Sequence, residues 1–501
     1  MPFNKDFIVK NGAQISANVV IGAYATVNVA PQGGMIISGN VGIGTATIDS
    51  NVSVQIGGST SAVRYYIDDS SSYPACSPSL YFNFINSISI DSRINFSRAS
   101  VGSYTSASGL ISKANINVPR FDYDASYIPP KPLGLLVEGA STNNLLYSES
   151  IGVGVGTSSW SYINPPLSAT TGYSAPDGST NGTLIVPPTT AGLYDVVQYF
   201  TTATNTNYVF SVYIKPTVST TWILLQLVTT GTNSGFVEAN FNIAGTGNVG
   251  IVDNSGTATS ATGNIFYVGN GWYKTILSGI PSVGSPTTTT RCAVRNSTSN
   301  GGGGNVVGDG VSGYILWGAQ LEITTIPIGT SYITTTSTTI TRSTDIATIP
   351  VGLWYNPTQG TLLATIVSNL IAASSFNWST LGFYGSPSNS NNLMDIFVGA
   401  GIIPVGRIIN NLSTEAYLNT GTLVNNTSNK IGLVYSPNGF LKASNQSNAN
   451  SATGNVIPTV SYLDIGTRNS GGIIPLTGHI QSISYWPLAF TSNQLSNTTG
   501  N

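Results

Sequence analysis

The chain has 501 residues, of which only 7% are charged, compared with about 25% in an ordinary soluble domain. A hydrophobic content of 41% and a net charge of -2 exclude the composition typical of disordered proteins. The scarcity of cations argues against a nucleic-acid partner, and no apolar run reaches the ~18 residues that would predict membrane insertion. We therefore expect a folded protein of several domains.

The N-terminal region contains an internal repeat. Residues 15–22 recur as residues 37–44, and a looser copy begins at Ile48. Short repeats of this kind predict stacked strands in a β-solenoid or an intertwined fibre, whose units bury their apolar faces on neighbours or on symmetry mates. Chance similarity in a stretch rich in Asn, Val, Ile and Gly is the alternative. Residues 1–60 are thus expected to form a β-repeat used for attachment or oligomerisation.

Alternation of apolar and polar residues dominates the rest of the chain and predicts an all-β fold. After the N-terminal repeat we expect a connecting module at 61–149 and two β-sandwich (jelly-roll) domains at 150–345 and 346–501. Strands are predicted at 208–215, 221–228, 236–243, 271–277, 313–321, 360–367, 381–385, 395–398, 430–435, 440–443, 462–466 and 478–486. The best helix candidate is a turn or two near residues 492–495.

Three segments, at residues 94–100, 118–124 and 133–146, resemble in order and spacing a module of bacteriophage tail-fibre and minor structural proteins. That resemblance implies a following jelly roll similar to carbohydrate-binding modules, in agreement with 210–216, 271–274 and 314–322. The run from Thr330 to Asp345 closes the same pattern, although Thr334 replaces an expected proline. Residues 433–435, 463–466 and 478–491 resemble a concanavalin-like (laminin-G-like) lectin sandwich, a common fold that says little about its ligand.

Several of the few charged residues lie within these motifs and among apolar neighbours. A charge in such surroundings needs a partner. We expect structural ion pairs among Arg98, Arg120, Glu138, Glu322, Arg342 and Asp345.

The sequence offers little for catalysis. His479 is the only histidine and lies in an alternating strand without a nearby nucleophile motif, so a structural role is expected. Asp122 and Asp124 share one face of a strand, where such pairs are expected to cap turns or meet arginines; a structural Ca²⁺ site is the first alternative and a glycosidase-like acid/base pair the second. No other cofactor is expected. Cys76 and Cys292 lack a metal or redox spacing and are expected to be buried free thiols.

Sugar recognition uses aromatic faces beside amide and carboxylate groups. The candidate ligand contacts are Trp160, Tyr162 and Tyr173, which are expected to be exposed because they lie in loop-like sequence near the start of the predicted jelly roll. Packing of these side chains within the loops is the alternative. The run of four glycines at 301–304 has no following Lys-Ser/Thr and is interpreted as a hairpin tip.

Together these features favour a non-enzymatic component of a phage virion, a tail fibre, spike or baseplate appendage that binds a host surface glycan or protein. The first residues lack the pattern of a signal peptide, whereas a surface wetted by Ser, Thr and Asn is typical of proteins that act outside cells. We expect synthesis in the host cytoplasm, release by lysis, and partners that include other virion proteins and its own copies, in a homotrimer. A capsid decoration, collar or connector protein is the alternative, followed by a polysaccharide depolymerase.

Overall fold

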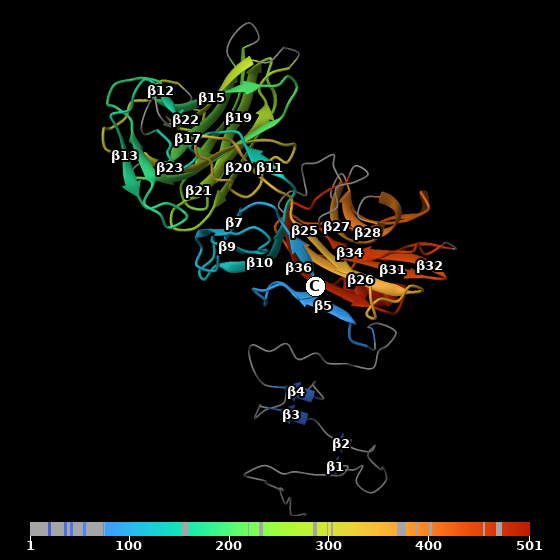
Figure 1. Ribbon diagram of the computed structural model, residues 1–501. Helices are drawn as coiled ribbons and strands as arrows, with labels where there is room; N and C mark the ends of the chain where they lie inside the picture. The colour runs from blue at the N-terminus through green and yellow to red at the C-terminus, as the bar shows by residue number, and fades with distance from the viewer. Residues whose placement is uncertain are drawn as a thin grey trace, which may run out of the picture. The chain divides into compact units, whose positions relative to one another are not determined.

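The structure is a computed structural model in which the chain divides into two compact units, Met1–Asp69 and Ser70–Asn501 (Figure 1). Described within it are residues 19–21, 35–37, 41–43, 54–56, 74 and 76–500, apart from 153–158, 219, 230–233, 284–287, 298, 302–303, 368–376, 387–388, 400–402, 454–455 and 467–472. Strands dominate the described residues, so the predicted all-β class is confirmed. No helix among these residues is long and apolar enough to cross a membrane.

The N-terminal unit contains two short parallel ladders. Strand β1 (Val19–Ile21) pairs with β2 (Met35–Ile37), and β3 (Val41–Ile43) pairs with β4 (Val54–Ile56). The sequence repeat makes β1 equivalent to β3, whereas the structure pairs each of them with a different strand. Parallel pairing of successive segments is compatible with stacked repeats. The remainder of the predicted repeat lies outside the described residues.

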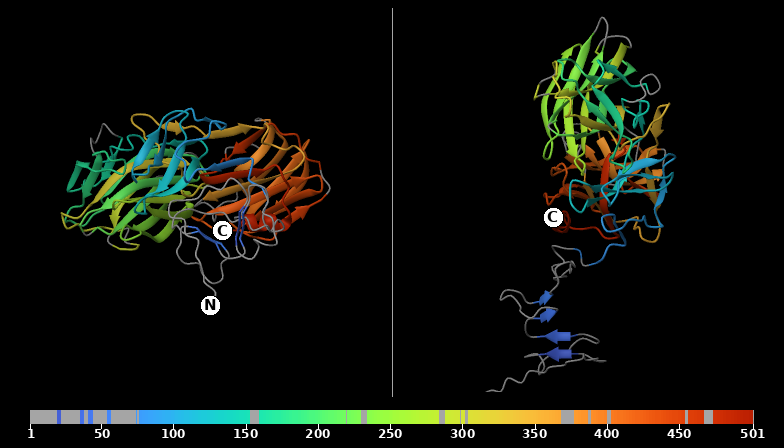
Figure 2. Two further views of the ribbon diagram at one scale, coloured as in Figure 1. Left: turned by 90° about the horizontal axis from the view of Figure 1, so that it is seen from below. Right: turned by 90° about the vertical axis from the view of Figure 1, so that its left-hand side faces the viewer.

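A jelly roll of two six-stranded antiparallel sheets occupies the middle of the chain (Figure 2, green and yellow). In the first, called the β17 sheet, the strands run in the order β12 (Ser161–Ile163), β15 (Asp195–Thr202), β22 (Thr288–Ser297), β17 (Trp222–Thr229), β18 (Gly235–Asn242) and β19 (Asn248–Gly256). In the second, the β16 sheet, the order is β13 (Ser168–Tyr173), β14 (Gly182–Val186), β23 (Tyr314–Ile323), β16 (Tyr208–Pro216), β21 (Tyr273–Ile280) and β20 (Thr259–Tyr267).

Alternation along the strands forms the jelly-roll core. Phe210, Val212 and Ile214 of β16 face Ile223 and Leu225 of β17 within one buried cluster. Because successive side chains of a strand point to opposite faces, the residues between these positions lie on the outer faces of the sandwich.

The C-terminal sandwich consists of two eight-stranded sheets. The β36 sheet has the order β33 (Asn450–Ala452), β32 (Gly439–Ser444), β31 (Asn429–Ser436), β26 (Gly360–Val367), β36 (Gly478–Trp486), β10 (Lys131–Val137) and β9 (Arg120–Asp124), with β5 (Leu80–Asn83) also on β36. The β27 sheet has the order β30 (Ser413–Asn419), β29 (Ile403–Asn410), β28 (Asn389–Gly399), β27 (Asn377–Ser386), β34 (Tyr462–Ile465), β25 (Ile346–Pro350) and β6 (Asn95–Ser97), with β35 (Ile473–Ile474) on β27. The predicted helix is confirmed as α1 (Ser492–Thr498).

Strands from the segment predicted as a connecting module belong to these two sheets. Figure 1 shows the blue and cyan strands β5 and β10 beside the red β36. At Gly134 the backbone has a φ of 113°, and a Cβ atom there would lie 2.5 Å from the carbonyl oxygen of Ile480. Glycine at this position therefore permits the close approach of β10 to β36.

Further short strands connect the two sandwiches. The hairpin of β7 (Gly102–Thr105) and β8 (Ile111–Ala114) precedes β9, and β11 (Ser141–Asn143) pairs with β24 (Ile340–Arg342). The jelly roll lies in the chain between β11 and β24. Because those two strands pair, the two ends of the jelly roll are held side by side.

Candidate functional site

Five of the charged residues predicted to pair meet in one buried group, which we call the arginine cluster: Arg98, Arg120, Glu138, Arg342 and Asp345. Arg98 Nη1 lies 3.0 Å from Asp345 Oδ1, and Arg120 lies 2.5 Å from the other oxygen of Asp345 and 2.7 Å from Glu138 Oε2. Arg342 Nη2 lies 3.6 Å from the same Glu138 oxygen. The cluster thus connects β9, the end of β10 and the β24–β25 segment.

Glu138 is additionally held by the segment that leaves the jelly roll. The backbone N–H and the hydroxyl of Ser331 donate to its two oxygens at 2.7 and 2.6 Å. Burial alone would raise the pKa of Glu138, but the charges of Arg342 and Arg120 and the Ser331 donors hold it well below its usual range.

The sixth predicted residue, Glu322, has a different set of partners. Its carboxylate accepts hydrogen bonds from the Ser141 hydroxyl and from the backbone and hydroxyl of Thr330, at 2.5, 2.9 and 2.6 Å. Hydroxyl and backbone donors therefore take the place of the expected arginine at this end of the jelly roll.

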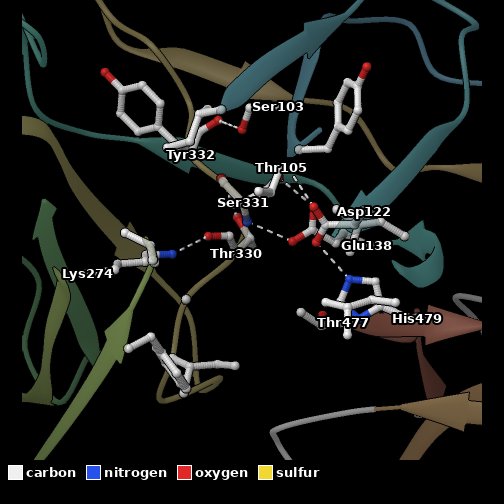
Figure 3. Close-up of a pocket in the computed structure, with 18 of the residues that line it drawn as sticks. Ser103, Thr105, Asp122, Glu138, Lys274, Thr330, Ser331, Tyr332, Thr477 and His479 are labelled. Atoms are coloured by element: carbon white, nitrogen blue, oxygen red, sulfur yellow. Dashed lines mark hydrogen bonds and ion pairs between the residues drawn. The ribbon is translucent and has the colours of Figure 1, made fainter. Parts of the chain in front are cut away.

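A cavity of about 210 Å³ lies next to the arginine cluster (Figure 3). We call it the junction cavity, because both the jelly roll and the β36 sheet contribute to its walls. Lys274 of β21 and the Thr330–Tyr332 segment come from the jelly-roll side, whereas Asp122 and His479 come from β9 and β36.

Asp122 and His479 form one polar pair in this cavity. His479 Nε2 lies 2.8 Å from Asp122 Oδ2, while the other Asp122 oxygen accepts from the Thr105 N–H at 2.6 Å. Asp124 instead caps a turn through the N–H and hydroxyl of Ser126. In the part of the chain that the structure describes, no three His, Cys, Asp or Glu side chains converge as a metal site. The Ca²⁺ site remains a prediction.

A second cavity, of about 560 Å³, is lined mainly by threonines, asparagines and small residues from 139–140, 205–207, 323–326, 344, 475 and 477. The amide of Asn207 in its wall is already used, because Nδ2 donates to Ser278 Oγ at 3.1 Å and to the Thr324 carbonyl at 2.6 Å. This cavity offers neutral contacts with few free hydrogen-bonding groups.

The outer face of the β17 sheet carries a row of polar side chains that we call the polar face: Asp195, Gln226, Glu238, Asn240, Arg291 and Arg295. They alternate along β15, β22, β17 and β18 with residues of the jelly-roll core, such as Val196, Leu225 and Val237, and so project from the opposite side.

The charged side chains of the polar face have partners within the face, which are charged for Asp195 and the two arginines and a neutral amide for Glu238. Arg295 binds Asp195 through two parallel hydrogen bonds, one of which joins Nη2 to Oδ2 at 2.8 Å. Gln226 Nε2 donates to Glu238 Oε2 at 2.7 Å. Burial raises the pKa of Glu238 despite that hydrogen bond.

The amides of the polar face retain unused hydrogen-bonding capacity. Gln226 and Asn240 are buried, with 9% and 1% of their surface exposed. Gln226 Oε1 and Asn240 Nδ2 nevertheless have no hydrogen-bond partner. Aromatic side chains lie on the same face, namely Tyr199, which is 48% exposed, and the half-buried Phe236. The face therefore combines one amide donor, one amide acceptor and exposed aromatic surface.

The three aromatic residues predicted to contact a ligand lie elsewhere. The expectation that Trp160 is exposed is wrong: it is 1% exposed in the jelly-roll core, and its indole N–H donates to the Tyr147 carbonyl at 3.2 Å, which allows it to be buried. Tyr162 is half-buried and donates to the Gly152 carbonyl, and burial raises its pKa. Tyr173 is half-buried against the cluster around Trp317. Ligand contacts by these tyrosines remain a prediction.

The thiols also differ from expectation at one position. Cys292 is buried in the jelly-roll core, where burial raises its pKa to about 12, whereas Cys76 is exposed. The prediction of two buried thiols is therefore wrong for Cys76. It precedes β5 in a Ser/Pro-rich stretch that adds no apolar cover.

The polar face was missed because the sequence search for ligand contacts concentrated on loops. Its residues lie within strands, and Thr288–Ser297, which supplies both arginines, was not predicted as a strand at all. The signal in the sequence that could have revealed the polar face is the recurrence of polar residues between core positions in neighbouring strands.

No protein-family model matches the chain, and neither does any curated protein. Solved structures give partial matches. The CBM40 module of the Ruminococcus gnavus IT-sialidase bound to α2,6-sialyllactose is 14% identical over 29% of this chain and 85% of that chain, with a TM-score of 0.25. Domain 4 of the Geobacillus stearothermophilus arabinanase AbnA with arabinotriose is 10% identical over 31% and 73%, with a TM-score of 0.24. Chicken galectin 2 is 14% identical over 25% and 88%, with a TM-score of 0.18. Likenesses at these scores carry no argument about ligand or activity.

Proposed function

We propose that this protein is a non-enzymatic component of a phage virion, a tail fibre, spike or baseplate appendage, and that its jelly roll binds a host surface glycan through the polar face. The assignment to a virion rests on the sequence motifs at 94–146 and 330–345. The structure supports treating these motifs as one unit, because their charged residues form the arginine cluster.

The single observation that carries the glycan proposal is the pair of unsatisfied amide atoms on the polar face. Gln226 Oε1 is an unused acceptor and Asn240 Nδ2 an unused donor, and a buried polar atom without a partner is costly unless a ligand or water pairs with it. Because both atoms are covered in the free protein, the side chains above them must move when a sugar binds. A sugar supplies hydroxyl groups that donate and accept, together with a C–H face that packs on an aromatic ring such as Tyr199. Because the charges of the face are paired internally, a neutral ligand suits it best.

Single sites of this kind bind weakly. Loss of one neutral hydrogen bond costs about 0.5–1.5 kcal/mol, or roughly 2- to 10-fold in affinity. A homotrimer, or several copies on one particle, would raise the overall affinity by linking such sites.

Adsorption competition tests the proposal. Purified protein should block phage adsorption to host cells, and the variants Gln226→Ala and Tyr199→Ala should need higher concentrations for the same block. Tyr417→Ala is the matched control, because Tyr417 is 54% exposed but belongs to the C-terminal sandwich.

Unimpaired adsorption at saturating protein would refute the receptor proposal. Electron microscopy of labelled virions would then separate the alternatives, because density on the capsid or neck and none at the tail would indicate a decoration or connector protein. Release of reducing ends from host polysaccharide by the purified protein would refute the non-enzymatic assignment.

A further inference from the structure

The junction cavity contains an ammonium group that has no carboxylate beside it. Lys274 is half-buried and donates one hydrogen bond, from Nζ to the Thr330 carbonyl at 3.0 Å. No carboxylate of the described residues lies within ion-pair distance of it, and Glu322, Glu138 and Asp122 act on it only from farther away. A partly buried charge with spare donors is stabilised by an anion that reaches it.

The other walls of the cavity contribute one further unused group. In both Glu138 and Asp122, each carboxylate oxygen already has a partner within the protein. His479 is 8% exposed, and its Nδ1 is buried without a hydrogen-bond partner. Because Nε2 faces the Asp122 carboxylate, Nδ1 is the ring nitrogen that is left to pair with a hydroxyl group of a ligand.

We propose that the junction cavity binds a sugar acid, whose carboxylate pairs with Lys274 and whose hydroxyl group forms a hydrogen bond with His479 Nδ1. Figure 3 shows these two side chains on opposite sides of the cavity. Its volume of about 210 Å³ lies below the roughly 300–1,000 Å³ of drug-sized ligand pockets, so it has room for one sugar ring. This site is separate from the polar face and does not depend on the proposed function.

Three probes of similar size and different charge test the inference: D-glucuronate, D-glucose and D-glucosamine. Isothermal titration at neutral pH should give a dissociation constant for glucuronate at least tenfold lower than for glucose, with glucosamine weakest. Lys274→Met should weaken glucuronate binding by roughly tenfold or more, in line with the loss of a charge-assisted hydrogen bond. Lys274→Arg should retain most of the binding. Lys131→Met, at an exposed lysine of β10, is the matched control.

Several results would overturn the inference. These are equal binding of glucuronate and glucose, tighter binding of glucosamine, undetectable binding of glucuronate, or unchanged binding by a Lys274→Met variant that keeps the wild-type circular dichroism spectrum. Loss of binding in Lys274→Arg together with a normal spectrum would also count against a charge-based site. If Lys274→Met does not fold, His479→Phe is used in its place. It should weaken the binding of glucuronate but keep the preference of the cavity for glucuronate over glucosamine.

A separate comparison distinguishes the source of the sugar acid. A polysaccharide that contains internal glucuronate should compete with free glucuronate if the cavity admits a residue within a chain. If only the free acid binds, the ligand is a small sugar acid. Because Gln226→Ala should impair adsorption and leave glucuronate binding unchanged, failure of this inference is distinguishable from failure of the proposed function.

Discussion

The substitution Glu138→Gln tests whether the arginine cluster holds the two sandwiches together. Glu138 is the only carboxylate within ion-pair distance of Arg342 among the described residues, and it shares Arg120 with Asp345. In the variant, three buried guanidinium groups would depend on Asp345 alone. Removing one partner of a buried ion pair costs about 3–5 kcal/mol, because the remaining charge stays desolvated. We expect a loss of this size in the free energy of unfolding.

Urea unfolding followed by circular dichroism and tryptophan fluorescence measures this loss. The matched control is Asp91→Asn, which removes an exposed pair between Arg93 and Asp91 at 2.8 Å and should cost at most about 1 kcal/mol. The wild type keeps the Glu138 contribution above the pKa of the unfolded side chain and loses it as the pH falls through the much lower folded value. The two proteins should therefore converge in acid. A Glu138→Gln variant as stable as the control at pH 7 would refute the structural role of the cluster.

Three further predictions follow from buried groups. Burial lowers the pKa of Lys442 to about 7, so the stability of the wild type should rise with pH between about 7 and the unfolded lysine pKa of about 10.4. Thermal unfolding at several pH values should show this rise for the wild type and not for Lys442→Met. Burial raises the pKa of Glu238, so its contribution to stability is present below the pKa of the unfolded side chain and is lost as the pH rises through the folded value. Glu238→Gln should therefore be more stable than the wild type at pH 7. A melting temperature of the variant below that of the wild type at this pH would contradict the expectation. Iodoacetamide should modify exposed Cys76 and spare Cys292 in the native protein, as mass spectrometry of its peptides can check.

Local patterns predicted the elements whose two faces differ in polarity. The strand expected at 208–215 is β16 (Tyr208–Pro216), and the helix expected near 492–495 begins after a capping box of Thr491 and Gln494. Strand β22 escaped prediction because its threonines and arginines carry little apolar signal. Local sequence also says nothing about long-range pairing, so it could not reveal that β10 joins β36.

The candidate sites show the same division between local and long-range information. Scarcity of charge singled out the residues of the arginine cluster, because a rare charge in an apolar motif requires a partner. The cavity beside the cluster depends on Lys274 and His479, which are far apart in the sequence and line the same cavity only through the packing of the jelly roll against the β36 sheet. The exposure of Trp160 was wrongly predicted, because a loop-like sequence does not show whether the indole N–H has a carbonyl acceptor in the protein interior.

The contacts of the buried carboxylates lie at the two connections between the jelly roll and the C-terminal sandwich. The two ends of the jelly roll leave the C-terminal sandwich as β11 and β24, in which Ser141 lies opposite Arg342. A domain joined by two adjacent strands could still pivot about them. Glu322 binds both Ser141 and Thr330, and Glu138 binds Ser331, so both connections are tied to buried carboxylates next to that pivot. The charges of the arginine cluster and of Glu322 therefore lie where they hold the jelly roll, and with it the polar face, in a fixed orientation on the sandwich that carries it.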